Sequence, residues 1–176
     1  MKNTIRVLSS GAAALLLLGS VGTAAAQGKK SAAASNARQH AADQKEVRDF
    51  RLTMDKLEKY ETAAKAFTKL TQQDPGLKKQ IEAETATGED TTLDSVVKAF
   101  EKHPAVVTAI KDAGLSTHDY VVMTFTMNEV ATEVGMKRSG AIKEYPASIL
   151  PENAAFVDQN FDRVNDLLNS MTTADQ

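Results

Sequence analysis

Cysteine and tryptophan are absent from this sequence, and aromatic residues of any kind are scarce. The 176 residues include no Cys, no Trp and only 5% aromatic residues. Without cysteine the chain can form no disulfide, no thiolate metal site and no c-type haem attachment, and it offers no cysteine for lipid attachment. A buried core must therefore consist of Leu, Val, Ile, Ala and Met together with the six Phe.

A strong charge of either sign is also lacking. The chain carries 21 Lys and Arg against 23 Asp and Glu. Residues 1–26 hold two of the basic and none of the acidic residues, so the rest of the chain has 19 basic and 23 acidic residues, a net charge of −4. This mild acidity offers no electrostatic surface for nucleic acid or anionic lipid, and we expect no nucleic-acid partner.

The first 26 residues have the form of an export signal. Lys2 and Arg6 provide the charged start, a short apolar run follows, and Ala24-Ala25-Ala26 matches a small-residue cleavage site. The apolar run is too short to span a bilayer comfortably. We predict cleavage before Gln27, a periplasmic or secreted product, and no integral membrane segment after cleavage.

The remaining 150 residues are enough for one domain with a core of its own. Residues 27–42 are rich in Ala, Ser, Lys and Gln and lack an apolar period, which predicts a flexible linker. The helical domain is expected over residues 43–171, followed by a tail at 172–176.

The most apolar stretch after the signal follows Ser116. At helical spacing, one stripe of apolar side chains consists of Tyr120, Met123, Met127, Val130, Ala131 and Val134. Val121, Val122 and Phe125 fall on the other side of the same cylinder. Neighbouring elements must therefore surround the first half of this segment.

Its flanks favour a helix over a strand. Alternation of apolar and polar residues from Val121 onward also suits a half-buried strand. However, Ser116-Thr117-His118-Asp119 has capping-box form, Gly135 stands where a left-handed C-terminal cap belongs, and no other segment offers a strand partner. We predict a buried central helix over residues 117–134.

Capping residues and apolar spacing predict five further helices. A capping-box pattern at Asp43 opens the first of them, which is long. They are expected from Asp43 to Gln73, from Pro75 to Thr85, from Thr92 to His103-Pro104, from Pro104 to Gly114-Leu115, and from Pro151 to Met171. The predicted fold is an all-α, single-domain bundle of about six helices, in which the long first, central and last helices form the bundle.

The sequence lacks the common motifs of catalytic, phosphate-binding and metal sites. The sequence contains no Glu-x-x-His pair for a di-iron site, no Gly-rich phosphate loop, no Gly-x-Ser-x-Gly and no His-Glu-x-x-His. His103 and His118 could titrate near neutral pH, but no partner for a catalytic dyad can be placed beside them. Met54, Met123 and Met127 lie on apolar stripes and are expected in the core. We therefore expect no catalytic residue, no cofactor and no metal.

A long segment without a clear period follows the central helix. Residues 135–150 carry Lys137, Arg138, Lys143 and Tyr145, and loops of this length inside a domain are often functional. These four residues form a possible interaction loop. The two cations next to the helix end have a second explanation, because they complement the helix dipole.

Part of the sequence is similar to known proteins. Residues 113–120 (Ala-Gly-Leu-Ser-Thr-His-Asp-Tyr), with Pro104 before them and 151–157 (Pro-Glu-Asn-Ala-Ala-Phe-Val) after them, resemble a loose group of small exported bacterial helical proteins of unknown function. The shared pattern is Ala-Gly-Leu-(Ser/Thr)-x-x-(Asp/Glu)-Tyr, and the resemblance covers about residues 92–168. It implies an exported α fold and no known activity.

These observations favour a periplasmic binding or interaction module without catalytic activity, whose partner is a protein. The alternative is a carrier that holds an apolar small molecule in a cavity between helices around the Met-containing central helix. An enzyme of unrecognised type comes third, with His118 and Tyr120 as the first residues to mutate.

Overall fold

The structure is a computed structural model that describes the backbone of residues 26–85 and 91–172 and the side chains of residues 37–85 and 91–170. This part of the chain contains helices and no strand, which confirms the predicted all-α class, with eight helices instead of about six. The helices are α1 (Ala26–Asp49), α2 (Met54–Gln73), α3 (Pro75–Thr85), α4 (Leu93–Glu101), α5 (Pro104–Asp112), α6 (Thr117–Arg138), α7 (Pro151–Gln159) and α8 (Phe161–Thr172).

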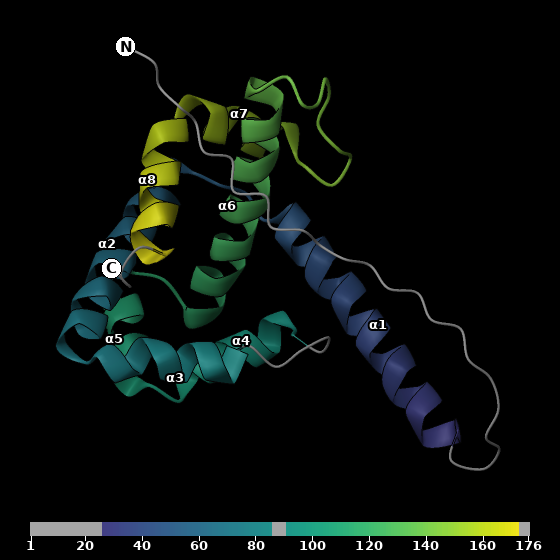
Figure 1. Ribbon diagram of the computed structural model, residues 1–176, viewed down its shortest axis with the longest axis vertical. Helices are drawn as coiled ribbons and strands as arrows, with labels where there is room; N and C mark the ends of the chain where they lie inside the picture. The colour runs from purple at the N-terminus through teal and green to yellow at the C-terminus, as the bar shows by residue number, and fades with distance from the viewer. Residues whose placement is uncertain (1–25, 86–90, 173–176) are drawn as a thin grey trace.

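The helices surround α6 on several sides. In Figure 1, α2 and α8 face α6, α7 bridges α6 and α8 at one end, and α3, α4 and α5 lie at the other end. The larger part of the core contains Leu57, Ile110, Met123, Val157 and Val164, all at most 1% exposed. A smaller cluster joins α1, α4 and the first turns of α6.

Helix α6 begins where the sequence predicts. The Ser116 hydroxyl accepts the Asp119 N–H at 2.9 Å and donates to the Asp119 carboxylate at 2.7 Å. All six members of the predicted stripe, together with Val121 and Val122, are buried. Phe125, expected inside, is 41% exposed. The buried central helix is confirmed, with one side chain placed wrongly.

The end of α6 differs from the prediction. Gly135 is an interior residue of the helix, which continues to Arg138. Gly140, with φ of 78°, is the left-handed residue instead: its N–H donates to Lys137 O, and the Ala141 N–H donates to Met136 O. The phenyl ring of Phe161 in α8 lies 3.7 Å from where a Cβ of residue 135 would stand, which is an ordinary contact distance.

Other local signals operate as predicted. Thr92 and Ser95 form a capping box at α4, and Pro75 and Pro104 open α3 and α5. Gly114, with φ of 86°, ends α5, and the Leu115 N–H folds back to Ile110 O at 3.2 Å. Each of these signals acts within a few residues of chain.

The N-terminal predictions need correction. Residues 27–42, expected as a flexible linker, belong to α1, because their many alanines have high helix propensity. The single helix expected from Asp43 to Gln73 is two helices, with Thr53 as the N-cap of α2. Asp43 caps another helix: its carboxylate accepts the Leu93 N–H of α4 at 2.9 Å.

Contacts from distant parts of the chain hold the break between α1 and α2. Asn153 of α7, only 2% exposed, accepts the Leu52 N–H at 2.9 Å and donates to Phe50 O at 2.7 Å. The Thr126 hydroxyl of α6 donates to Val47 O at 3.0 Å. These bonds replace the helical hydrogen bonds that the chain gives up at the break.

The last predicted helix is also divided. Asn160 separates α7 from α8 with φ −114° and ψ 24°, and its side chain donates to Phe156 O at 2.8 Å. The break lets Val157 and Val164 both reach zero exposure.

Met54, expected in the core, is 40% exposed at the start of α2.

Several predictions concern residues outside the described part of the chain. The export signal lies there except for Ala26, as do the loop at 86–90 and nearly all of the tail. Over residues 26–85 and 91–172, no helix combines the length and the apolar character that crossing a membrane requires.

Candidate functional site

A hollow of about 430 Å³ lies where α2, α3, α4, α6 and α8 meet. We call it the aromatic pocket. Its apolar wall is formed mainly by Phe67, Ile81, Phe100, Tyr120, Phe125 and Leu168. Five helices, from α2 in the first half of the chain to α8 near its end, therefore contribute to one concave surface.

Aromatic rings concentrate at this pocket although the chain has few of them. The rings of Tyr60 and Tyr120 stack with centroids 4.7 Å apart. Phe100 lies 5.9 Å from Tyr120 and 6.1 Å from Phe67. Four of the nine Phe and Tyr residues thus form one continuous cluster, and three of the four line the pocket. Such pairs prefer the offset and tilted geometries seen here.

The hydroxyl groups behind this wall are used inside the protein. The Thr124 hydroxyl donates to Tyr120 O at 2.8 Å, and a hydrogen bond of 2.7 Å joins the hydroxyl oxygens of Thr124 and Tyr60. Burial raises the pKa of the Tyr120 hydroxyl to about 12 and the pKa of Tyr60 well above its ordinary value. The wall therefore presents neutral phenols and ring faces.

Two charged side chains of α3 also line the pocket. Lys78 is 14% exposed, and its Nζ lies 3.8 Å from Oε1 of Glu82 one turn later. Their opposite charges face each other across this distance. The pocket as a whole is therefore an apolar hollow without a net charge of its own.

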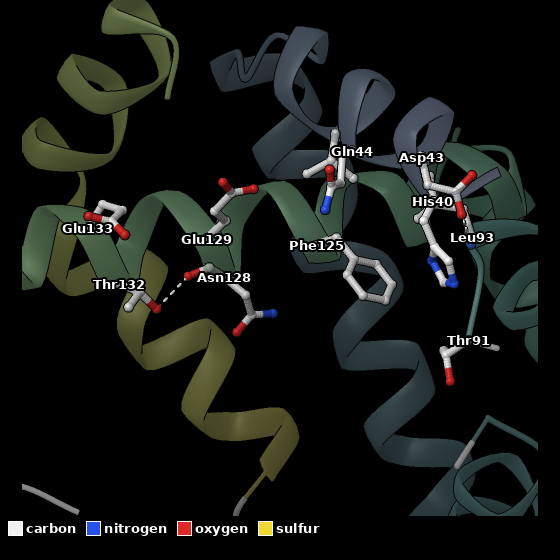
Figure 2. Close-up of a pocket in the computed structure, with 11 residues that line it drawn as sticks. His40, Asp43, Gln44, Thr91, Leu93, Phe125, Asn128, Glu129, Thr132 and Glu133 are labelled. Carbon is white, nitrogen blue, oxygen red and sulfur yellow. Dashed lines mark hydrogen bonds between the residues drawn. The ribbon is translucent and has the colours of Figure 1, made fainter. Parts of the chain in front are cut away.

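A second hollow, of about 460 Å³, adjoins the first between α1, α4 and α6. We call it the carboxylate groove. Phe125 and Asn128 of α6 and Thr91 before α4 line both hollows, so the two are adjacent. Figure 2 shows Phe125, Glu129 and Glu133 spaced along α6, with His40 and Asp43 on α1.

The residues of the predicted interaction loop are placed differently from expectation. Lys137 and Arg138 belong to the last turn of α6. The Lys137 ammonium lies 4.1 Å from the Tyr145 ring centroid, and Arg138 donates to the Asp158 carboxylate at 2.7 Å while stacking on Phe161. Lys143 is exposed. Three of the four residues therefore make contacts within the molecule.

The two histidines considered for chemistry lie in separate surroundings. Nε2 of His103 is 3.7 Å from Oε2 of Glu84, and Nε2 of His118 is 3.4 Å from Oε1 of Glu46. The structure does not bring the two imidazoles together. Among the described residues, no group of three or more His, Asp and Glu side chains has an arrangement that could hold a metal ion.

The sequence interpretation missed this site because it treated its residues as ordinary core. Tyr120 belongs to the predicted buried stripe of the central helix, and Phe67 and Phe100 stand in two of the other predicted helices. The scarcity of aromatic residues was a signal in the sequence, but no local pattern predicts that Phe67, Phe100 and Tyr120 come together.

Comparison of the chain with protein-family models, curated proteins and solved structures finds no match. The geometry of the two hollows is therefore the basis for the function proposed below.

Proposed function

We propose that this protein binds an apolar small molecule in the aromatic pocket and has no catalytic activity of its own. The observation that carries the proposal is the gathering of Phe67, Phe100, Tyr120 and Phe125 around one hollow between helices. Its volume of about 430 Å³ lies within the range of about 300–1,000 Å³ typical of small-molecule sites.

The exposure of Phe125 supports this role. Phe125 and Met54 are the large hydrophobic side chains that the described part of the chain leaves exposed, at 41% and 40%. Met54 already contacts another side chain, since its sulfur lies 3.2 Å from Nη1 of Arg163. Phe125 borders both hollows, so a ligand there would remove exposed ring surface from water.

A protein-binding loop has less support. Lys137, Arg138 and Tyr145 are engaged by neighbours within the molecule, so a partner would have to displace existing contacts. The pocket needs no such rearrangement, because its concave wall is already formed. We therefore place the binding function in the pocket.

The test uses N-phenyl-1-naphthylamine, an apolar probe whose fluorescence rises in a nonpolar site. We expect saturable binding to the purified protein, and Phe125→Ala should weaken it by about fivefold, because the ring's contact area with the probe is lost. Met54→Ala is the matched control, with equal exposure outside the pocket.

Equal affinity of both variants and the unaltered protein would show that the probe binds elsewhere. Failure of the probe and of other apolar probes to bind would contradict the proposal. A ligand recovered by native mass spectrometry from protein purified from its own host would identify the natural compound.

A further inference from the structure

The carboxylate groove has a one-sided charge. Asp43, Glu129 and Glu133 line it together with His40, and the described residues of its lining include no Lys or Arg. The carboxylates do not converge as metal ligands would, since the described residues contain no such group. They lie instead along the side of a hollow that adjoins the aromatic pocket at Thr91, Phe125 and Asn128.

The two glutamates of α6 are not neutralised within the protein. Neither forms an ion pair among the described residues, and Oε2 of Glu133 is buried without a hydrogen-bond donor. Lys137, four residues after Glu133, is placed to pair with it on the helix, but its ammonium lies over the Tyr145 ring. Buried polar atoms are normally hydrogen-bonded, so a donor or cation from a ligand would stabilise this carboxylate oxygen.

Cations near Glu129 are engaged as well. Lys45 and Arg48 border a third hollow, to which Glu129 also contributes. Both pair with Asp49, Lys45 at 2.6 Å and Arg48 at 3.0 Å. Asp43 differs from the two glutamates because its carboxylate already accepts hydrogen bonds from Leu93 N–H and the Gln39 amide, each at 2.9 Å.

We infer that the ligand is an organic cation with an apolar body, held with its apolar part in the aromatic pocket and its cationic group in the carboxylate groove beside Glu129 and Glu133. This inference rests on the proposed binding function. Phe125 stands at the boundary of the two hollows, so its ring face can also attract the cation. An anionic head group would meet three carboxylates there.

The test compares three compounds with the same alkyl chain: decyltrimethylammonium, decanoate and decanol. Each competes with N-phenyl-1-naphthylamine for the protein below its micelle concentration. We expect the cation to compete about tenfold more strongly than the alcohol, and decanoate least well. The advantage should shrink as ionic strength rises from about 0.01 to about 1 M, because the screening length falls from about 30 to about 3 Å.

The double variant Glu129→Gln/Glu133→Gln should bind decanol normally and lose most of the preference for the cation. Glu144→Gln, which removes an exposed carboxylate outside both hollows, is the control and should keep the preference. Asp43 is left unchanged because it caps α4.

The outcomes separate this inference from the proposed function. Equal competition by all three compounds, or a preference that survives in the double variant, would overturn the cationic ligand while leaving the apolar site intact. Stronger binding of decanoate would overturn it too and direct attention to Lys78. If none of the compounds or the probe binds, the proposed function itself fails.

Discussion

The two sides of α6 differ more than their sequences suggest. On the side that faces α2, α5 and α7, Met123, Met127 and Val134 have zero exposure. On the side that borders the hollows, Phe125 is 41% exposed although it is larger and more apolar than many core residues. The same helix is thus buried along one side and only partly covered on the other, where Phe125 is exposed but Val121 and Val122 are buried.

Tertiary contacts explain this difference. On one side, the side chains of α6 pack into the larger core cluster, whereas on the other side α1 and α4 bury Val121 and Val122 through Val47, Leu93, Val96 and Val97 but leave Phe125 exposed. The difference shows that an apolar side chain marks a core only where a neighbour arrives to cover it. Where no neighbour arrives, the same kind of side chain can form a binding surface.

The largest effect expected from this comparison is on stability. Met127→Ala should lower the free energy of unfolding by about 2–5 kcal/mol, because it leaves a cavity in a sealed core. Phe125→Ala should cost less than about 1 kcal/mol, because the ring is partly in water already. Urea unfolding followed by circular dichroism measures both. Similar losses would mean that the two sides are packed alike.

High pH should lower the free energy of unfolding through Tyr60 and Tyr120, whose rings stack between α2 and α6. Burial raises the pKa of Tyr120 to about 12 and the pKa of Tyr60 well above its ordinary value, while an unfolded tyrosine titrates near 10. Both states are protonated below pH 10, so this contribution is fully present there. Above pH 10 the unfolded state loses protons first, and stability should fall by about 1.4 kcal/mol per pH unit for each tyrosine.

Urea unfolding at a series of pH values, with tyrosinate absorbance on the folded protein, tests this prediction. Tyr60→Phe should reduce the slope. If the folded protein showed all its tyrosines titrating near 10, the aromatic cluster would have to be open to water.

The smallest effects concern the two glycines near the end of α6. Gly135→Ala should stabilise the protein by about 0.5–1 kcal/mol, because residue 135 is inside a helix and an added Cβ would make ordinary contact with Phe161. Gly140→Ala should destabilise it by about 1–2 kcal/mol, because φ is 78° there. Thermal unfolding of both variants gives the signs. Reversed signs would place the helix end at Gly135, as the sequence alone predicts.

The sequence alone predicted only the kind of site, and not the residues that form it. A cavity for an apolar molecule around the central helix was one of the functions considered, but its residues were not named. The pocket combines Phe67, Phe100 and Tyr120 from three helices, and no local pattern states that these helices meet. In the predicted interaction loop, by contrast, the Lys137 ammonium already packs over the Tyr145 ring.

The sequence by itself determined the all-α class, the buried central helix and the ends of helices at Ser116, Thr92, Pro75, Pro104 and Gly114. Capping, proline and glycine effects act within a few residues, so they can be read without a fold. Only the tertiary structure decided the break between α1 and α2, the division at Asn160 and the exposure of Phe125. Asn153 holds the first break from about a hundred residues away, and Phe125 is exposed because no helix covers it. Long-range contacts leave no local signal in the chain that makes them.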